Sequence, residues 1–229
     1  MESSNDRSVN EAREQRILDA AAKLIVHYGY DKTTVSDIAR EAGISKGAIY
    51  LHYSSKEALF EALLYREVLA YSDDWLQRFE ADESIWSFAG MFKLMLLTMQ
   101  AHPFMVAIFR RDPHVFGSFL RRDSTVLQQK GTANAQLFSM LQGVGAMRDD
   151  IDPKVIAYLL NLFAYGLVSA DEALPQADAP SFEDTVEGLA QLLDRGLAPK
   201  DGGNREAAKA IIQQISGALR EQWKQRQHK

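Results

Sequence analysis

The chain has 229 residues, of which 46% are hydrophobic and 25% are charged, and its formal net charge is −5. This length suits one sizeable core with room for a small second domain, and the acidic balance argues weakly against nucleic-acid binding. The absence of cysteine excludes disulfides, thiolate metal sites and cysteine nucleophiles.

The N-terminal residues 1–10 are polar and contain no apolar run, so we expect a disordered leader and no secretory signal. The most apolar stretch, residues 155–170, is interrupted by Asn161 and Ser169 and is shorter than the ~20 residues of a membrane span. We therefore expect a soluble, cytoplasmic protein without stable membrane insertion.

The first predicted helix begins at Glu11 and ends before Gly29. Its apolar residues recur at spacings of four, three and four, the period of one helix face: Ile17, Ala21, Leu24 and Tyr28.

Two short helices follow, with a start or stop signal at each end. Thr34 and Asp37 have the spacing of a capping box, Gly43 suits a left-handed helix end, and Ser45 suits the cap of the next helix. Ser54 and Glu57 predict a second capping box, which begins a longer helix. The order of these parts is that of a helix-turn-helix.

The remaining predicted elements are also helices, and no strand pattern is found. They span residues 56–79, 85–101, 104–111, 115–141, 154–172 and 182–197. Pro103 and Pro153 stand where a first helical residue is expected. A glycine-containing linker, 199–204, precedes a last amphipathic segment, 205–227.

Residues 11–64 resemble the DNA-binding domain of the TetR family of bacterial regulators. The resemblance is carried by the run Ile44-Ser45-Lys46-Gly47-Ala48-Ile49-Tyr50-Leu51-His52-Tyr53, in which Ala48 replaces a frequent Thr or Ser. It implies an all-α fold with a three-helix helix-turn-helix domain at 11–55 and a ligand-binding and dimerisation domain at 56–199. It also implies a homodimeric repressor that binds a palindromic DNA operator and is released by a small apolar or amphipathic effector.

The resemblance assigns contacts to operator DNA residue by residue. The residues expected at phosphates, the groove or bases are Thr34, Ser36, Ser45, Lys46, Gly47, Ala48, Tyr50, Leu51, His52, Tyr53 and Lys56. For any one of them, and for Tyr50 and Tyr53 in particular, a packing role is an even alternative. Residues 1–60 hold eight Lys or Arg against nine Asp or Glu, so few phosphate contacts are expected.

A methionine-rich set of side chains suggests a ligand pocket, because methionine packs adaptably around varied shapes. The set is Phe88, Met91, Phe92, Met95, Met99, Met105 and Phe109. Ordinary core packing is the alternative for each residue alone.

The segment 154–172 is apolar nearly all round, so one chain has too little to cover it and a two-fold partner is expected. The predicted dimer residues are Ile156, Leu160, Phe163, Leu167, Leu189 and Leu193. An ordinary core helix is the alternative.

Residues 200–229 carry seven Lys or Arg against three acids, and their pattern predicts a basic amphipathic helix. TetR-like chains commonly end before such a helix, so this segment departs from the family pattern. We expect it to dock on the body of the protein; contact with DNA or a membrane surface is the alternative.

No catalytic motif, cofactor motif or metal-ligand spacing is found, and His102 and His114 lack a third ligand, so we expect neither an enzyme nor a metal site. A transcriptional activator of the same family, and a membrane- or protein-binding adaptor that acts through the last helix, remain alternative functions.

Overall fold

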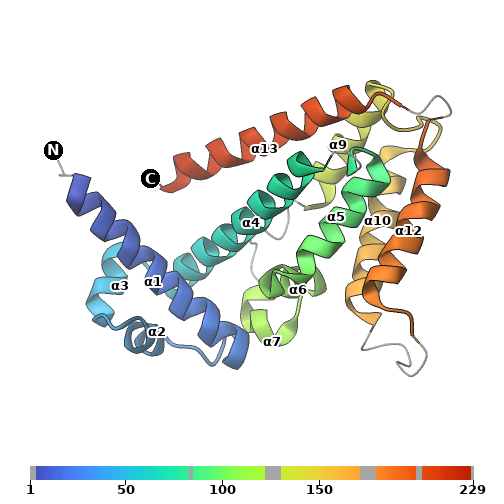
Figure 1. Ribbon diagram of the computed structural model, residues 1–229. Coiled ribbons are helices and arrows are strands. Elements are labelled where there is room, and N and C mark those ends of the chain that lie inside the picture. Colours follow the sequence, from blue (N-terminus) through green and yellow to red (C-terminus); the bar gives the residue numbers. More distant parts are fainter. Residues whose placement is uncertain (1–3, 83–84, 122–129, 171–178, 200–202, 228–229) are drawn as a thin grey trace. The chain divides into compact units, whose positions relative to one another are not determined.

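The computed structural model describes residues 4–82, 85–121, 130–170, 179–199 and 203–227 (Figure 1). Every regular element in these ranges is a helix, which confirms the all-α prediction. The chain divides into two compact units: unit 1 comprises residues 1–67 and 111–127, and unit 2 comprises 68–110 and 128–229. The boundary differs from the one predicted at residue 55, because helix α4 (Lys56–Ala81) belongs to both units.

Helix α1 of unit 1 spans Ser4–Tyr28, so residues 4–10 are helical. This corrects the prediction of a disordered leader for residues 4–10; residues 1–3 lie outside the described residues. These residues lack an apolar stripe, but adding turns to a helix that is already nucleated needs no buried face of its own.

Local capping signals define α2 (Val35–Ala42) and α3 (Lys46–His52) as predicted. Both halves of the Thr34–Asp37 capping box are formed, and Gly43 ends α2 with a φ of 67°. The Ser45 hydroxyl accepts a hydrogen bond from the Ala48 N–H at 3.1 Å. At the start of α4 the prediction was one residue early, because Ser55 accepts the hydrogen bond of the Ala58 N–H.

The predicted helix over 115–141 is wrong, because its first part forms α7 (Pro113–Phe116) and a 3-10 helix, η2 (Gly117–Arg121). Gly117 has a φ of 48°, and a Cβ there would lie 2.3 Å from a carboxylate oxygen of Asp31. That carboxylate accepts hydrogen bonds from the Ser118 N–H at 2.9 Å and from its hydroxyl at 2.5 Å. The rings of Phe116 and Phe119 pack against Phe60 in the core of unit 1.

Unit 2 contains α5 (Phe88–Gln100), α6 (Pro103–Arg110), α9 (Lys130–Gly143), α10 (Pro153–Val168) and α12 (Phe182–Leu197). Helix α12 packs on α5, and α10 packs on α9. Pro103 and Pro153 are the first residues of α6 and α10, as predicted. Their fixed φ suits this position, where the missing N–H has no partner within the helix.

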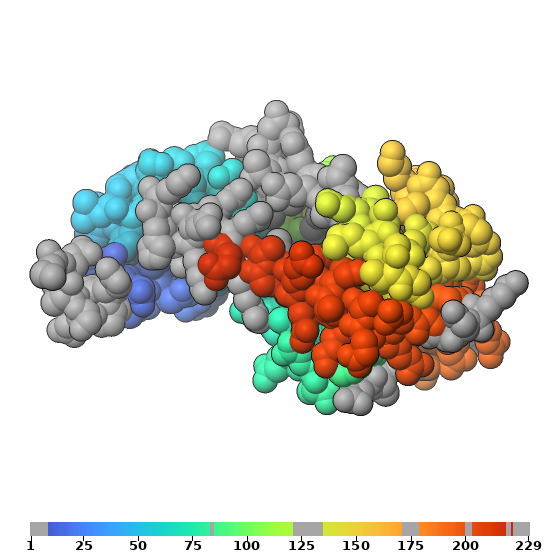
Figure 2. All heavy atoms as spheres, turned by 90° about the horizontal axis from the view of Figure 1, so that it is seen from above, coloured from blue at the N-terminus to red at the C-terminus, as the bar shows by residue number. Residues whose placement is uncertain are grey.

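The predicted last helix is α13 (Arg205–Gln227). Its residues Ala208, Ile211 and Ile212 are buried in the core of unit 2, and it contacts α9. Figure 2 shows α13 (red) lying along the surface beside α9 (yellow). The first half of the helix is therefore docked on the body, as expected.

Within the described residues, no single helix has both the length and the apolar character needed to cross a membrane. Helices α5 and α6 meet that criterion only when taken together, and they are bent by 109° at the break between them.

Candidate nucleic-acid interface and effector cavity

Helix α3 presents side chains that the fold of unit 1 does not use. Ile49 is buried and anchors the helix, whereas Lys46, Gly47, Tyr50 and Leu51 are exposed. Leu51 is 85% exposed, and the Lys46 ammonium lies 6.0 Å from the centre of the Tyr50 ring. A Cβ on Gly47 would meet only the Ser45 hydroxyl, at 3.9 Å, so packing within the chain does not require glycine there. This exposed set is free to meet an external surface.

Other predicted contacts lie at the helix starts beside α3. Ser36 and Ser45 are exposed, and so is Thr34, whose hydroxyl donates to the Asp37 carboxylate at 2.6 Å. Hydrogen bonds from Thr34 hold the pKa of the Asp37 carboxyl below its usual range, so this group stays ionised. Ala48 and His52 are half-buried.

Two predicted phosphate contacts are instead used inside unit 1. Tyr53 is 7% exposed, and its hydroxyl donates to Glu14 of α1 at 3.0 Å. The Lys56 ammonium donates to the Tyr30 carbonyl at 2.5 Å and lies 4.0 Å from the centre of the Tyr30 ring, and burial lowers its pKa. Tyr53 therefore ties α3 to α1, which corrects its assignment, and Lys56 secures the start of α4.

The structure brings all seven residues of the methionine-rich set together around one cavity of about 310 Å³, here called the methionine cavity. Met91, Met95 and Met99 come from one face of α5, and Met105 and Phe109 come from α6. The volume lies at the lower end of the range for small-molecule sites, ~300–1,000 Å³. The bent α5–α6 pair thus supplies two walls of a space large enough for a small ligand.

Residues from four other helices complete the described lining, and the sequence had not indicated them. They are Tyr71, Ser72 and Trp75 of α4, Leu137, Phe138 and Leu141 of α9, Leu160 and Asn161 of α10, and Ile212, Ile215 and Ser216 of α13. A hydrophobic period shows which residues share a helix face, but it does not show which helix that face meets.

A family model described as "Bacterial regulatory proteins, tetR family" matches residues 17–63, which include α2, α3 and the start of α4. This part of the chain is similar to the helix-turn-helix DNA-binding domain of the TetR family of bacterial transcription regulators.

Individual proteins are similar to this chain beyond the helix-turn-helix. It is 27% identical to the HTH-type transcriptional repressor Rv1474c of Mycobacterium tuberculosis, over 69% of this chain and 81% of that protein. It is also 27% identical to the A-factor receptor protein of Streptomyces griseus, over 69% of this chain but only 54% of the receptor. The fold resembles that of FadR from Bacillus subtilis in complex with stearoyl-CoA, with a TM-score of 0.54, 17% identity, and coverage of 78% and 96% of the two chains.

The six predicted dimer residues do not all lie on an exposed surface. Ile156, Leu160 and Leu193 are buried in the core of unit 2, Leu167 and Leu189 are half-buried, and Phe163 is 42% exposed. A partner cannot reach the three buried residues, which corrects the prediction for them. Because α10 is apolar nearly all round, its period did not show which face packs inward.

The opposite side of α10 and one residue of α12 form the exposed apolar face. In the described part of the chain, seven of the twelve exposed large apolar side chains lie there: Val155, Tyr158, Leu159, Leu162, Phe163, Tyr165 and Leu192. Such a concentration on two helices is typical of a protein interface.

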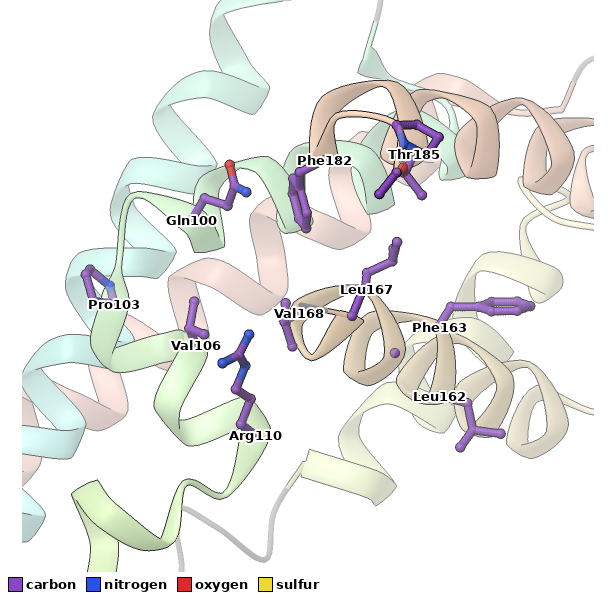
Figure 3. Close-up of a pocket in the computed structure, with 14 residues that line it drawn as sticks. Gln100, Pro103, Val106, Arg110, Leu162, Phe163, Leu167, Val168, Phe182 and Thr185 are labelled. Carbon is purple, nitrogen blue, oxygen red and sulfur yellow. The ribbon is translucent and has the colours of Figure 1, made fainter. Parts of the chain in front are cut away.

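A groove of about 950 Å³ adjoins this apolar face (Figure 3). Figure 3 shows Val106 and Arg110 of α6 on one side and Leu162, Phe163 and Leu167 of α10 on the other. Leu162 and Phe163 belong to both the groove and the face, so a partner bound to the face would cover part of the groove.

Proposed function

We propose that this chain is a ligand-responsive transcriptional repressor that binds a palindromic operator as a homodimer. The exposed face of α3 carries the proposal, because Lys46, Tyr50 and Leu51 contribute little to the fold and are presented together on a capped helix. In a helix-turn-helix the second helix enters the major groove, and a dimer places two such helices on two half-sites. The names of the repressor Rv1474c and the A-factor receptor support both repression and response to a ligand.

The methionine cavity is the proposed effector site. Its lining is mainly apolar, which favours a small apolar or amphipathic molecule. Two of its walls continue directly into unit 1: α4 runs through both units, and α6 ends at Arg110, one residue before the chain passes to unit 1. An effector that favours one arrangement of α4 and α6 can therefore bias unit 1 and lower operator affinity.

The experiment is a fluorescence-anisotropy titration of DNA from upstream of the chain's own gene, at a stated salt concentration, with a scrambled duplex as control. We expect selective, saturable binding by the wild type. Leu51→Ala should weaken it about tenfold, equivalent to ~1.4 kcal/mol of lost contact, without changing the melting temperature. Val26→Ala, at an exposed apolar position on α1, is the matched control.

Equal binding to both duplexes across several candidate promoters, or an unchanged affinity of Leu51→Ala, would contradict operator recognition through α3. A promoter–reporter fusion then tests the direction of regulation, since a repressor lowers reporter output and an activator raises it.

A further inference from the structure

Helix α13 supplies part of the methionine cavity. Ile212, Ile215 and Ser216 line it together with residues of α4, α5, α6, α9 and α10. The sequence predicted docking of this helix on the body, with contact to DNA or a membrane surface as the alternative. Its cavity-lining residues show that docking also brings α13 to the proposed effector site.

The first half of α13 is held on unit 2 by specific contacts. The Asn204 N–H donates to the Gly145 carbonyl at 3.2 Å, and the Asn204 side chain accepts from the Ala207 N–H at 3.0 Å, which caps the helix. The Lys209 ammonium lies 3.5 Å from the centre of the Trp86 ring. Burial extends to Ile215 and Ser216, which are half-buried, and ends at Gly217, which is exposed. The residues that line the cavity therefore lie at the end of the anchored stretch.

The cavity wall also limits the chemistry of its occupant. None of the described lining residues is charged. The Tyr71 hydroxyl donates to the Met95 carbonyl, Ser72 to the Val68 carbonyl, and the Asn161 amide to the Ala157 carbonyl, so these donors are satisfied within the chain. An ionised group placed against this lining would lose part of its hydration without gaining a countercharge from the described lining residues, which is unfavourable.

We propose that α13 is a wall of the effector site, and that the effector is an uncharged, predominantly apolar molecule in contact with Ile212 and Ile215. This inference rests on the proposed function, because it identifies the methionine cavity as the effector site. It predicts that substitutions on α13, more than a hundred residues from α3 in the sequence, alter effector binding while operator binding by the effector-free protein is retained.

The test uses N-phenyl-1-naphthylamine, an uncharged dye that fluoresces in apolar surroundings, and its anionic relative 1-anilinonaphthalene-8-sulfonate. We expect the uncharged dye to bind the full-length protein with one site per subunit and at least about tenfold more tightly than the anionic dye. Ile215→Trp, which fills the cavity, should weaken binding of the uncharged dye about tenfold or more. Gln214→Trp, at the neighbouring exposed position, should not.

Circular dichroism and operator binding serve as folding controls. If Ile215→Trp does not fold, Ile215→Ala replaces it, and the loss of contact area should weaken dye binding about threefold to tenfold, against Gln214→Ala as control. The proposal is overturned if the uncharged dye does not bind the wild type, if the anionic dye binds as tightly, or if the Ile215 variants bind like their controls. If the protein binds the operator but not the dye, the proposed regulator stands and the proposed effector site is refuted. If dye binding depends on α13 but the protein does not bind the operator, the proposed effector site stands and the proposed regulator is refuted.

Discussion

The residues of the helix-turn-helix fall into two groups. Those of the first group stabilise its fold, and those of the second group are exposed on its surface. Tyr53 belongs to the first group, because its hydroxyl is bonded to Glu14 and its ring is buried. Gly43 also belongs there, since a side chain at its φ of 67° would be strained. Gly47 belongs to the second group: its backbone is not left-handed, and the nearest atom to a Cβ there would be the Ser45 hydroxyl, in ordinary contact at 3.9 Å. Because the fold does not require glycine here, we propose that a partner surface approaches the backbone closely at this position.

Gly47→Ala should therefore separate stability from DNA binding. Alanine is the better helix former, so we expect the free energy of unfolding to rise by up to about 1 kcal/mol, measured by urea denaturation. Operator affinity should fall, because the added methyl group holds α3 away from the groove floor. The matched control is Gly217→Ala on α13, another exposed helical glycine with open space around it, which should leave operator affinity unchanged. If Gly47→Ala binds the operator as tightly as the wild type, operator DNA does not approach the α3 backbone closely at this residue.

At the scale of elements, α10 shows how one helix serves two surfaces. Ile156, Leu160 and Ala164 are buried on its inner side, while Tyr158, Leu162 and Tyr165 are about half to two-thirds exposed on the other. If a second copy of the chain, related by a two-fold axis, covered this outer side, the same apolar residues would be buried in both subunits.

Leu162→Glu is expected to weaken the dimer. Each dimer would bury two unpaired carboxylates, so the dissociation constant should rise at least about tenfold in sedimentation equilibrium. Val26→Glu makes the same change at an exposed apolar position on α1 and should keep the wild-type mass, twice 25.7 kDa. A monomeric wild type, or a fully dimeric Leu162→Glu, would show that this face is not the interface.

For the whole molecule, the sequence predicted what depends on local signals. The caps at Thr34 and Ser45 and the bounds of α12 and α13 follow from residues within a turn of each helix end. The break at Gly117 depends on Asp31, which is far away in the sequence, and no local pattern indicates it. The methionine-rich set was found because it recurs on one face of α5, but the α13 wall of the cavity depends on tertiary packing.

The charge of the whole molecule leads to the last prediction. The chain carries a net charge of −5, and cations near the helix-turn-helix are already engaged: Arg40 with Asp37, Lys23 with Glu41 and Lys56 with the Tyr30 carbonyl. Few counterions should then be released from DNA on binding.

We therefore expect a shallow dependence of operator affinity on salt. The slope of log affinity against log salt should be well below the ~10 found for a protein that neutralises about ten phosphates. Lys46→Gln should reduce the slope by about 1 for each subunit, because an exposed lysine on α3 is the expected phosphate contact. Anisotropy titrations between 50 and 200 mM salt, on the order of the range where such contacts dominate affinity, measure both slopes. A steep wild-type slope that Lys46→Gln leaves unchanged would mean that cations outside the helix-turn-helix bind the DNA, and the basic segment 205–227 would be the first to substitute.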